Sequence, residues 1–260
     1  MIDKKNISLE NILSAKKQNF LYRISPRILK NIYDKYELMY LQNKYSYNAD
    51  HREILWDWKS IQYNRIALVN LLLSKYENPK YLEIGCASNS LFDSVFAYDK
   101  VGVDPAKGGT IRKTSDEFFK KNRTKFDVVF IDGLHTYEQV RKDINNALRF
   151  LNLNKKSGSW ICLHDMLPGN WKEQHVPILT KGTWTGDVWK VAFELSQTQG
   201  VEFKIVKIDH GVGVIKVTKK NIKLKDLTET MTNKQFPYYF DSLKKLPVTN
   251  WENSQKWLLG

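Results

Sequence analysis

From residue 61 onward, short apolar runs alternate with segments whose apolar residues recur at helical spacing. We predict that the apolar runs are strands, at residues 81–85, 100–105, 126–132, 159–165, 202–208 and 211–217. We predict that the other segments are helices, at residues 90–98, 115–122, 136–151 and 186–199. Continuous apolar runs are typical of strands buried on both faces, and intervening helices connect parallel neighbours. The pattern therefore predicts a doubly wound α/β sheet.

Both ends of this region depart from the alternation. Only Asp209 and His210 separate the last two runs ahead of Gly211, which favours a tight antiparallel hairpin. Helical spacing recurs earlier, over residues 28–41 and 65–76. We therefore divide the chain into an N-terminal helical cap, an α/β domain and an irregular or helical C-terminal tail, at residues 1–60, 61–218 and 219–260.

Composition narrows the class of protein. With 260 residues, the chain is long enough for one α/β domain with extensions. No apolar run is long enough to span a membrane and no signal-peptide core follows the N-terminus, so we expect a cytoplasmic protein. Cys86 and Cys162 lie in apolar segments and are expected to be reduced. The net charge of +13 is scattered, which favours solvated lysines over a nucleic-acid site.

The first two predicted strands end in residues that suit an adenosine ligand. In open α/β sheets, ligands bind beyond the carboxyl ends of the strands. The first strand ends in a turn with Glu83, Gly85 and Ala87, whose small residues let the backbone approach a ligand. Asp104 follows roughly 20 residues later, the spacing at which an acid accepts from both ribose hydroxyls. A dinucleotide is disfavoured because the later glycines of its turn are missing.

Two further motifs suit either helix capping or ligand contact. Ser88 to Ser90 follow the glycine turn and can cap the predicted helix over residues 90–98. Ser115 and Asp116 open the next helix, where Asp116 can also accept from an adenine amino group. Asp187 and Trp189 also allow two interpretations. Either both face a substrate, or Asp187 caps a helix and Trp189 packs in the core.

Acids and histidines follow two other predicted strands. Asp132 ends one strand and is followed by His135, and His164 and Asp165 end the next. These ends meet at one edge of the predicted sheet, so we expect the four side chains to converge. Carboxylates favour magnesium or calcium, and imidazole favours zinc, iron or nickel. The alternative is structural hydrogen bonding between two loops.

Five motifs in order carry a resemblance to class I S-adenosylmethionine-dependent methyltransferases, especially the small-molecule and macrolide-sugar O-methyltransferases. They are YLEIGCASNSLF, VGVDP, SDEFF, FDVVFIDGLHTYEQV and GSWICLHDM. The resemblance implies a mostly parallel seven-stranded Rossmann-like sheet with a C-terminal antiparallel hairpin and an N-terminal helical extension. Two departures stand out. The family usually has a further glycine near Ser88 or Asn89, and its metal-dependent members carry an acidic or amide pair where His164-Asp165 stands.

The resemblance also implies roles for individual residues. It makes residues 61–218 a catalytic domain that binds S-adenosylmethionine through Glu83, Gly85, Ala87, Asp104, Ser115, Asp116 and Asp132. We expect catalysis by Asp132, His135 and His164. A divalent metal, magnesium first, is expected at Asp132, His164 and Asp165, and either the metal or His135 eases deprotonation of an acceptor hydroxyl.

The expected acceptor is a glycosyl or other hydroxylated small molecule. The aromatic N-terminal helices are expected either to pack a homo-oligomer or to close over the substrate. One alternative is a nucleic-acid methyltransferase, but the Asn/Asp-Pro-Pro-Tyr-type motif after the fourth strand is absent and IDGLH stands there. The other is a metal-binding α/β domain or hydrolase that does not use S-adenosylmethionine.

Overall fold

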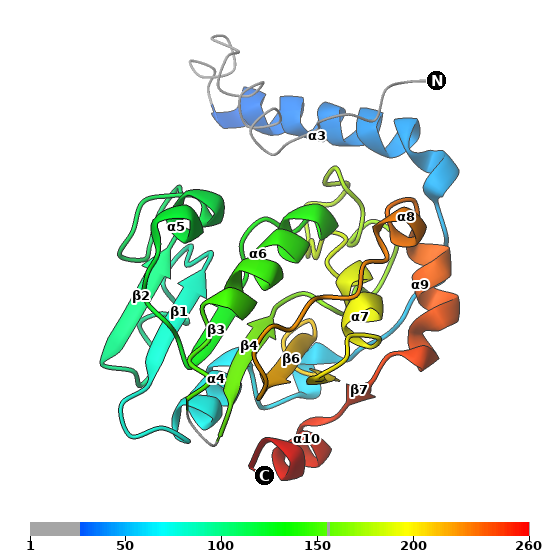
Figure 1. The fold of residues 1–260 in the computed structure, drawn as a ribbon. Helices are drawn as coiled ribbons and strands as arrows, with labels where there is room; N and C mark the ends of the chain where they lie inside the picture. The colour runs from blue at the N-terminus through cyan, green and yellow to red at the C-terminus, as the bar shows by residue number, and fades with distance from the viewer. Residues whose placement is uncertain (1–26, 155–156, 260) are drawn as a thin grey trace.

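The computed structural model describes residues 27–154 and 157–259, and its centre is one seven-stranded sheet (Figure 1). The strands are β1 (Lys80–Ile84), β2 (Asp99–Val103), β3 (Val128–Ile131), β4 (Ser159–Leu163), β5 (Val201–Val206), β6 (Val212–Val217) and β7 (Val248–Thr249). Their order is β2-β1-β3-β4-β6-β5-β7, and among the described strands β6 alone runs antiparallel to its neighbours. The predicted parallel sheet with an antiparallel hairpin is confirmed.

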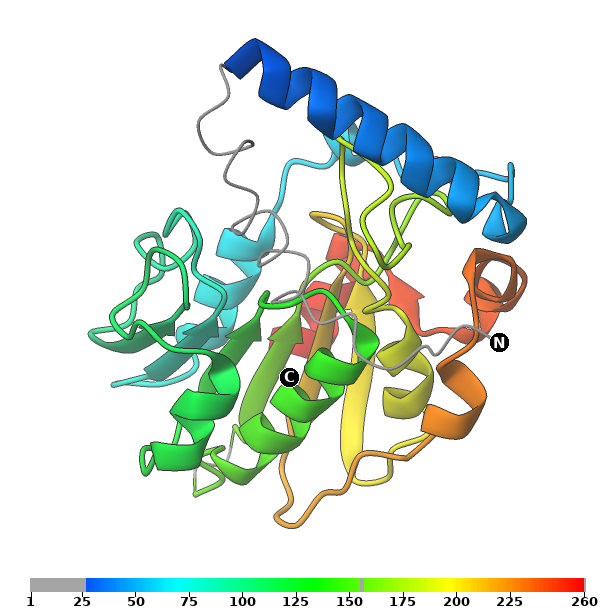
Figure 2. The same cartoon turned by 90° about the horizontal axis from the view of Figure 1, so that it is seen from above.

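Helices cover both faces of this sheet (Figures 1 and 2). They are α3 (Arg27–Lys44), α4 (Arg65–Leu73), α5 (Ser115–Lys121), α6 (Tyr137–Arg149), α7 (Lys190–Leu195), α8 (Thr228–Met231), α9 (Phe236–Ser242) and α10 (Trp251–Leu259), with 3-10 turns η1 (Ser46–Asn48), η2 (Trp58–Ser60) and η3 (Leu243–Lys245). Among the described residues, no helix has the length and apolar character needed to cross a bilayer.

The central strands β1, β3, β4 and β6 are buried on both faces, as their continuous apolar runs predict. In β1, Leu82 packs in the core with α5, α6 and α7, whereas Tyr81 packs in the core with α4 and α10. In β3, Val129 and Val128 divide in the same way. Adjacent side chains point to opposite faces of a strand, so a strand between two helical layers needs apolar residues at every position.

The crossover helices begin where the sequence supplies caps. At α5, the Thr114 hydroxyl accepts from the Glu117 amide while the Glu117 carboxylate accepts from the Thr114 amide, a capping box. At α6, the Thr136 hydroxyl accepts from Gln139. At α4, the Asn64 side chain accepts from the two amides at Ile66 and Ala67.

The prediction of a helix over residues 90–98 is wrong. This segment forms turns. The first turn starts as a helix would, with the Asp93 amide donating to the Asn89 carbonyl. The side chain of Asn70 in α4 then donates to the Ser94 carbonyl and accepts from the Phe96 amide. These bonds to Asn70 satisfy backbone groups that a continuing helix would need, so the helix ends after one turn.

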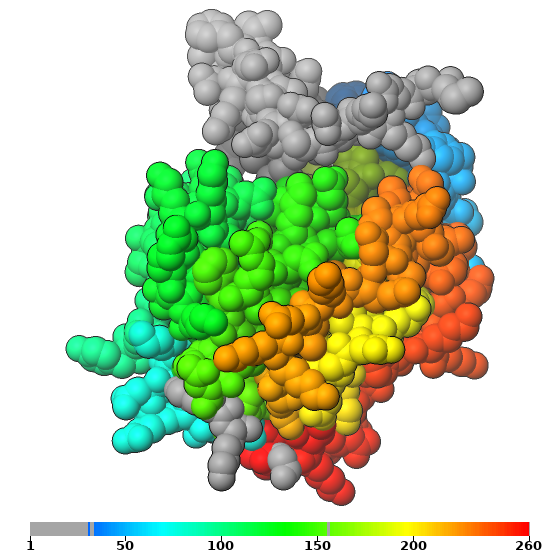
Figure 3. All heavy atoms as spheres, in the orientation of Figure 1, coloured from blue at the N-terminus to red at the C-terminus, as the bar shows by residue number. Residues whose placement is uncertain are grey.

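The C-terminal segment completes the sheet. The sequence predicts an irregular or helical tail, and the structure places α8, α9, β7 and α10 there. Strand β7 pairs in parallel with β5, and Trp251 and Leu258 of α10 lie in the core beneath α4. Figure 3 shows the orange segment after β6 lying across the yellow segment that contains α7. There the Leu227 amide donates to the buried Glu194 carboxylate. The domain boundaries stay a prediction.

One buried acid in α6 lacks full hydrogen bonding. Asp143 is 1% exposed, its Oδ1 accepts from Gln139, and its Oδ2 has no hydrogen-bond partner. Burial raises the pKa of Asp143 to about 6, although hydrogen bonds from Ser115 and Gln139 act in the opposite direction. The carboxylate form is therefore unfavourable in the folded protein.

Replacing this acid by its amide should stabilise the protein at neutral pH. Because the folded-state pKa lies above the ordinary value of 3.8, the contribution of Asp143 to stability is full below about pH 4 and is lost as the pH rises through 6. Asp143→Asn should remove this loss and raise the free energy of unfolding at neutral pH by roughly 2–3 kcal/mol. Urea unfolding between pH 4 and 7 measures it, with the exposed Asp93→Asn as control. An equal decline with pH in Asp143→Asn would contradict the expectation.

Candidate functional site

The acids and histidines predicted to converge meet at the carboxyl edge of the sheet. Asp132 follows β3, and His164 and Asp165 follow the adjacent β4. Backbone bonds extend the sheet by one residue, because the Asp132 amide donates to the Ile84 carbonyl and the His164 amide donates to the Ile131 carbonyl. The side chains therefore start from neighbouring, ordered positions.

These four side chains form one cluster of contacts, which we call the acid–imidazole cluster (Asp132, His135, His164 and Asp165). His135 Nε2 lies 3.1 Å from Asp132 Oδ1, and its Nδ1 lies 3.1 Å from Asp165 Oδ2. His164 Nδ1 lies 3.2 Å from Asp165 Oδ1 and 3.3 Å from Asp132 Oδ1. Each imidazole therefore faces both carboxylates.

The carboxylates change the titration of the imidazoles. Burial opposes the charged form of His164, but the negative charges of Asp132 and Asp165 outweigh burial and hold its pKa well above the ordinary value. His135 behaves similarly, since its hydrogen bond to Asp132 and the nearby carboxylate charges raise its pKa against burial. Burial likewise opposes the charge on Asp132, and the two histidines reverse that effect and lower its pKa. The cluster therefore favours ion pairs.

The same residues fit a divalent cation. Asp132, His164 and Asp165 each offer one ligand atom, and these atoms lie within 4.8 Å of one another. Two carboxylates and one imidazole form a ligand set that suits magnesium or a first-row transition metal, with positions left for water or an acceptor. The predicted metal ligands are thus brought together, and their role as ligands stays a prediction.

Sequence reasoning missed two charged residues at this cluster. Arg65, the first residue of α4, places Nη1 2.8 Å from His164 Nε2 and 3.4 Å from Asp132 Oδ2. Its Nε lies 3.4 Å from Oδ2 of Asp209, in the turn between β5 and β6. Neither residue belongs to a strand-end motif, and only the packing of α4 and the hairpin against β4 brings them here.

Backbone strain collects at the same edge. Five residues other than glycine have positive φ there: Ala87 at 45°, Asn89 at 64°, Asp165 at 61°, Asp209 at 45° and His210 at 61°. Such conformations are costly for residues with a Cβ and concentrate at functional sites. Asn89 stands near the position where related motifs carry a further glycine, and asparagine tolerates this left-handed conformation best.

The predicted cofactor turn connects directly to this edge. Gly85 has a φ of +87°, and a Cβ added to it would lie 2.0 Å from the carbonyl oxygen of Asp132. Asp104 joins the turns after β1 and β2, because Oδ2 accepts from the Ala87 amide while Oδ1 accepts from the amides of Ala106 and Lys107. Asp104 therefore orders the loop where we predict the ribose.

Glu83 lies beneath the turn. Its side chain is 2% exposed and accepts from the Tyr81 hydroxyl at 2.6 Å. Burial raises the pKa of Glu83 to about 7; the Tyr81 hydrogen bond opposes this shift and the Asp132 charge adds to it. Farther along the edge, Gln139 Nε2 donates to Ser115 Oγ and Asp116 Oδ1, each at 3.2 Å.

Two residues near this edge have structural contacts. Asp187 accepts from the Tyr137 amide at the start of α6 and from Lys190 Nζ. Trp189 is fully buried and donates from Nε1 to Gln174. The structure thus favours the capping and packing interpretation of both.

Aromatic rings border the acid–imidazole cluster on two sides. Trp184 stacks on His135, with ring centroids 5.2 Å apart and planes inclined by 17°. On the other side, Trp58 contacts His210 at 5.4 Å, and His210 lies edge-on to His164 at 6.4 Å. Helix α3 lies above the loop between β4 and α7, where Gln42 donates to the Leu179 carbonyl (Figure 2).

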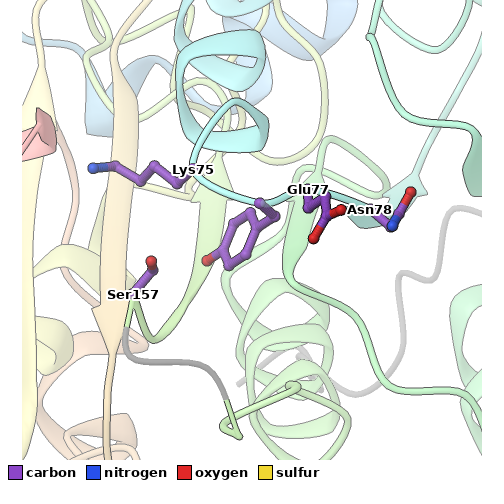
Figure 4. A pocket seen from close by; sticks show the side chains of 5 residues that line it. Lys75, Glu77, Asn78 and Ser157 are labelled. Carbon is purple, nitrogen blue, oxygen red and sulfur yellow. The ribbon is translucent and has the colours of Figure 1, made fainter.

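A pocket of about 390 Å³ lies at the opposite edge of the sheet. The segments that precede β1 and β4 form it, and it is lined by Lys75, Tyr76, Glu77, Asn78 and Ser157 (Figure 4). The Tyr76 hydroxyl donates to the Gly158 carbonyl there. Because strands β1 and β4 begin at this edge, the pocket is separate from the acid–imidazole cluster.

The central part of the chain is similar to a known protein family. A family model described as a methyltransferase domain matches residues 97–166. This segment runs from β2 through the end of β4 and contains the whole acid–imidazole cluster, with Asp104, Ser115 and Asp116. No curated protein sequence matches the chain.

Several solved structures resemble the chain at low identity. The MycE methyltransferase of the mycinamycin biosynthetic pathway, in complex with Mg and SAH, is 16% identical, with a TM-score of 0.37; the match covers 64% of this chain and 51% of MycE. The N-methyltransferase NodS from Bradyrhizobium japonicum is 14% identical, with coverages of 62% and 95% and a TM-score of 0.37. A methyltransferase from Geobacter sulfurreducens is 10% identical, with coverages of 80% and 97% and a TM-score of 0.39.

The chain thus spans about half the length of MycE. The three TM-scores lie below 0.5, so the fold assignment depends on the strand order and not on these superpositions.

Gly85→Ala should unfold or strongly destabilise the protein. The new methyl group would overlap the Asp132 carbonyl at a backbone φ that disfavours any Cβ, which should cost about 3 kcal/mol or more. Urea unfolding measures the loss. Gly182→Ala is the matched control, because its Cβ would meet only Thr180 Oγ1, at 3.5 Å. Equal stabilities of the two variants would disprove the close contact.

Proposed function

We propose that this chain transfers a methyl group from S-adenosylmethionine to a hydroxyl of a small molecule, assisted by a divalent metal. The methyltransferase-domain match over residues 97–166 and the strand order support a class I methyltransferase. The observation that carries this proposal is the backbone contact between Gly85 and Asp132. It places the predicted cofactor turn directly beside the acid–imidazole cluster. A methyl donor and an acceptor bound at these two features would be neighbours.

The cofactor is assigned to the β1 and β2 side of this edge. Bound S-adenosylmethionine would supply a sulfonium-activated methyl group. We assign the sugar of the cofactor to Asp104 and its amino acid portion to the turn at Gly85 and Ala87, with Glu83 and Asp132 bordering it. Asp104 Oδ2 accepts one backbone bond, so this oxygen keeps a lone pair for a ribose hydroxyl. Ser115 and Asp116 are assigned to the adenine side.

The acceptor hydroxyl is assigned to the acid–imidazole cluster. Methyl transfer to oxygen needs the acceptor proton removed and the oxygen aligned with the methyl carbon. Both ring nitrogens of His135 face carboxylates, so a proton on this ring is stabilised by Asp132 and Asp165. A metal held by Asp132, His164 and Asp165 would lower the pKa of the acceptor hydroxyl, and magnesium is our first candidate.

The surroundings support a small organic acceptor. Binding sites for such molecules combine aromatic walls with a few converging polar groups. Here Trp184 stacks on His135 of the acid–imidazole cluster, and Trp58 packs on His210, which lies edge-on to His164. We propose a glycosyl or similar hydroxylated molecule. A cytoplasmic location and a homo-oligomer stay predictions from the sequence.

Asp104→Asn should weaken cofactor binding. Asparagine has one oxygen where aspartate has two, so the variant loses either a backbone hydrogen bond of the loop or the ribose contact. S-adenosylhomocysteine should then bind at least about tenfold more weakly. Isothermal calorimetry measures this affinity. Asp99→Asn is the control, because Asp99 starts the same strand and pairs with Lys80 on the surface. Failure of the unchanged chain to bind S-adenosylhomocysteine, combined with metal-dependent hydrolysis, would favour the hydrolase alternative.

Asp132→Asn should strongly reduce methyl transfer while the protein stays folded. The substitution removes the charge that both imidazoles face, and we expect turnover to fall at least about 100-fold. Radiolabelled methyl transfer to a panel of glycosides measures activity, and calorimetry measures the affinity for S-adenosylhomocysteine. Chelation should silence the unchanged protein and magnesium should restore it. Full activity of Asp132→Asn would remove this residue from the reaction centre.

A further inference from the structure

We infer that Arg65 competes with the divalent cation for the acid–imidazole cluster, and that Asp209 is the carboxylate that receives Arg65 when a cation binds. The inference rests on the proposed metal assistance. It assigns a role to two charged residues that have none in the proposed cofactor binding or acceptor chemistry. Cation binding at this site would then be an exchange of positive charges.

Arg65 already contacts two of the three candidate metal ligands. Its Nη1 lies 2.8 Å from His164 Nε2 and 3.4 Å from Asp132 Oδ2. At these distances, the guanidinium and a bound cation would both lie between the same side chains. Two positive charges this close repel strongly in a partly buried site, where water screens them little. A cation therefore binds Asp132 and His164 at full strength only if the guanidinium moves away.

The contact with His164 occupies an atom that a metal ion would use. Arg65 Nη1 lies 2.8 Å from Nε2 and 3.3 Å from Nδ1 of this ring. The carboxylates of Asp132 and Asp165 lie 3.3 and 3.2 Å from the same Nδ1. An imidazole binds a metal ion through a ring nitrogen, so the guanidinium and a cation would compete for the same ring.

Asp209 provides the alternative partner. Its Oδ2 lies 3.4 Å from Arg65 Nε, and its Oδ1 lies 3.6 Å from His164 Nε2. The turn that carries Asp209 is built from strained residues, with Asp209, His210 and Gly211 all at positive φ. A small rotation of the guanidinium would strengthen the Asp209 pair as it releases Asp132. The hairpin turn would thus hold the displaced arginine.

The test uses manganese as the cation probe on the full chain, with binding followed by electron paramagnetic resonance and by calorimetry. Arg65→Gln removes the competing charge and keeps a polar side chain, so it should bind manganese at least about tenfold more tightly than the unchanged protein. Arg52→Gln is the matched control, because Arg52 pairs with Asp50 and Asp241 away from the cluster. Circular dichroism verifies that each variant is folded.

A second substitution tests the receiving carboxylate. Asp209→Asn should weaken manganese binding, and the weakening should be several-fold smaller when Arg65→Gln is already present, because no arginine then needs a partner. An equal effect in both backgrounds would remove Asp209 from the exchange and leave only a general charge effect.

The outcomes separate this inference from the proposed function. Equal or weaker manganese binding by Arg65→Gln would overturn the competition, while loss of binding in Asp132→Asn would still support the metal site. If neither the unchanged protein nor Arg65→Gln binds manganese, the metal site and the competition both fail. Binding of S-adenosylhomocysteine and methyl transfer without added metal would then decide the methyltransferase proposal separately.

Discussion

The close backbone contact between Gly85 and Asp132 is the constraint on which the functional edge depends. Strands β1 and β3 are adjacent and parallel, so their carboxyl ends leave the sheet side by side. Only a residue without a Cβ lets the two chains continue so near each other. This contact brings a turn suited to a nucleoside ligand against an acid that faces two imidazoles. A wider separation would move the proposed methyl-donor site away from the proposed acceptor site.

Beyond this contact, buried carboxylates face positively charged side chains. Asp132 and Asp165 are partly or fully removed from water, and an isolated carboxylate there would be costly. His135, His164 and Arg65 supply the compensating charge and hydrogen bonds. The balance also underlies our inference that an added cation displaces a charge that is already present. We therefore regard Arg65 and Asp209 as part of the same electrostatic unit.

The strained backbone at this edge follows strands that lie in a well-packed core. The sheet beneath it is buried on both faces, and its residues are apolar at nearly every position. Stabilisation from that core offsets the unfavourable conformations of Ala87, Asp165 and Asp209. The strain positions side chains that a relaxed turn would point elsewhere.

Sequence alone determined the elements whose signal is local. Continuous apolar runs predicted β1, β3 and β4, and helical spacing predicted α5 and α6. Strand-end positions predicted that Asp132, His135, His164 and Asp165 would meet. Local pattern failed over residues 90–98, where the Asn70 side chain interrupts a helix that the apolar spacing favours.

Only the tertiary structure decided the rest, because it depends on contacts between distant segments. Strand β7 has two residues and forms only against β5, so no periodicity could reveal it. Arg65 and Asp209 lie 144 positions apart in the sequence, and they meet only because α4 and the β5–β6 hairpin pack beside β4. Sequence thus identified the polar side chains that meet at the strand ends, and packing added the two charged residues that contact them.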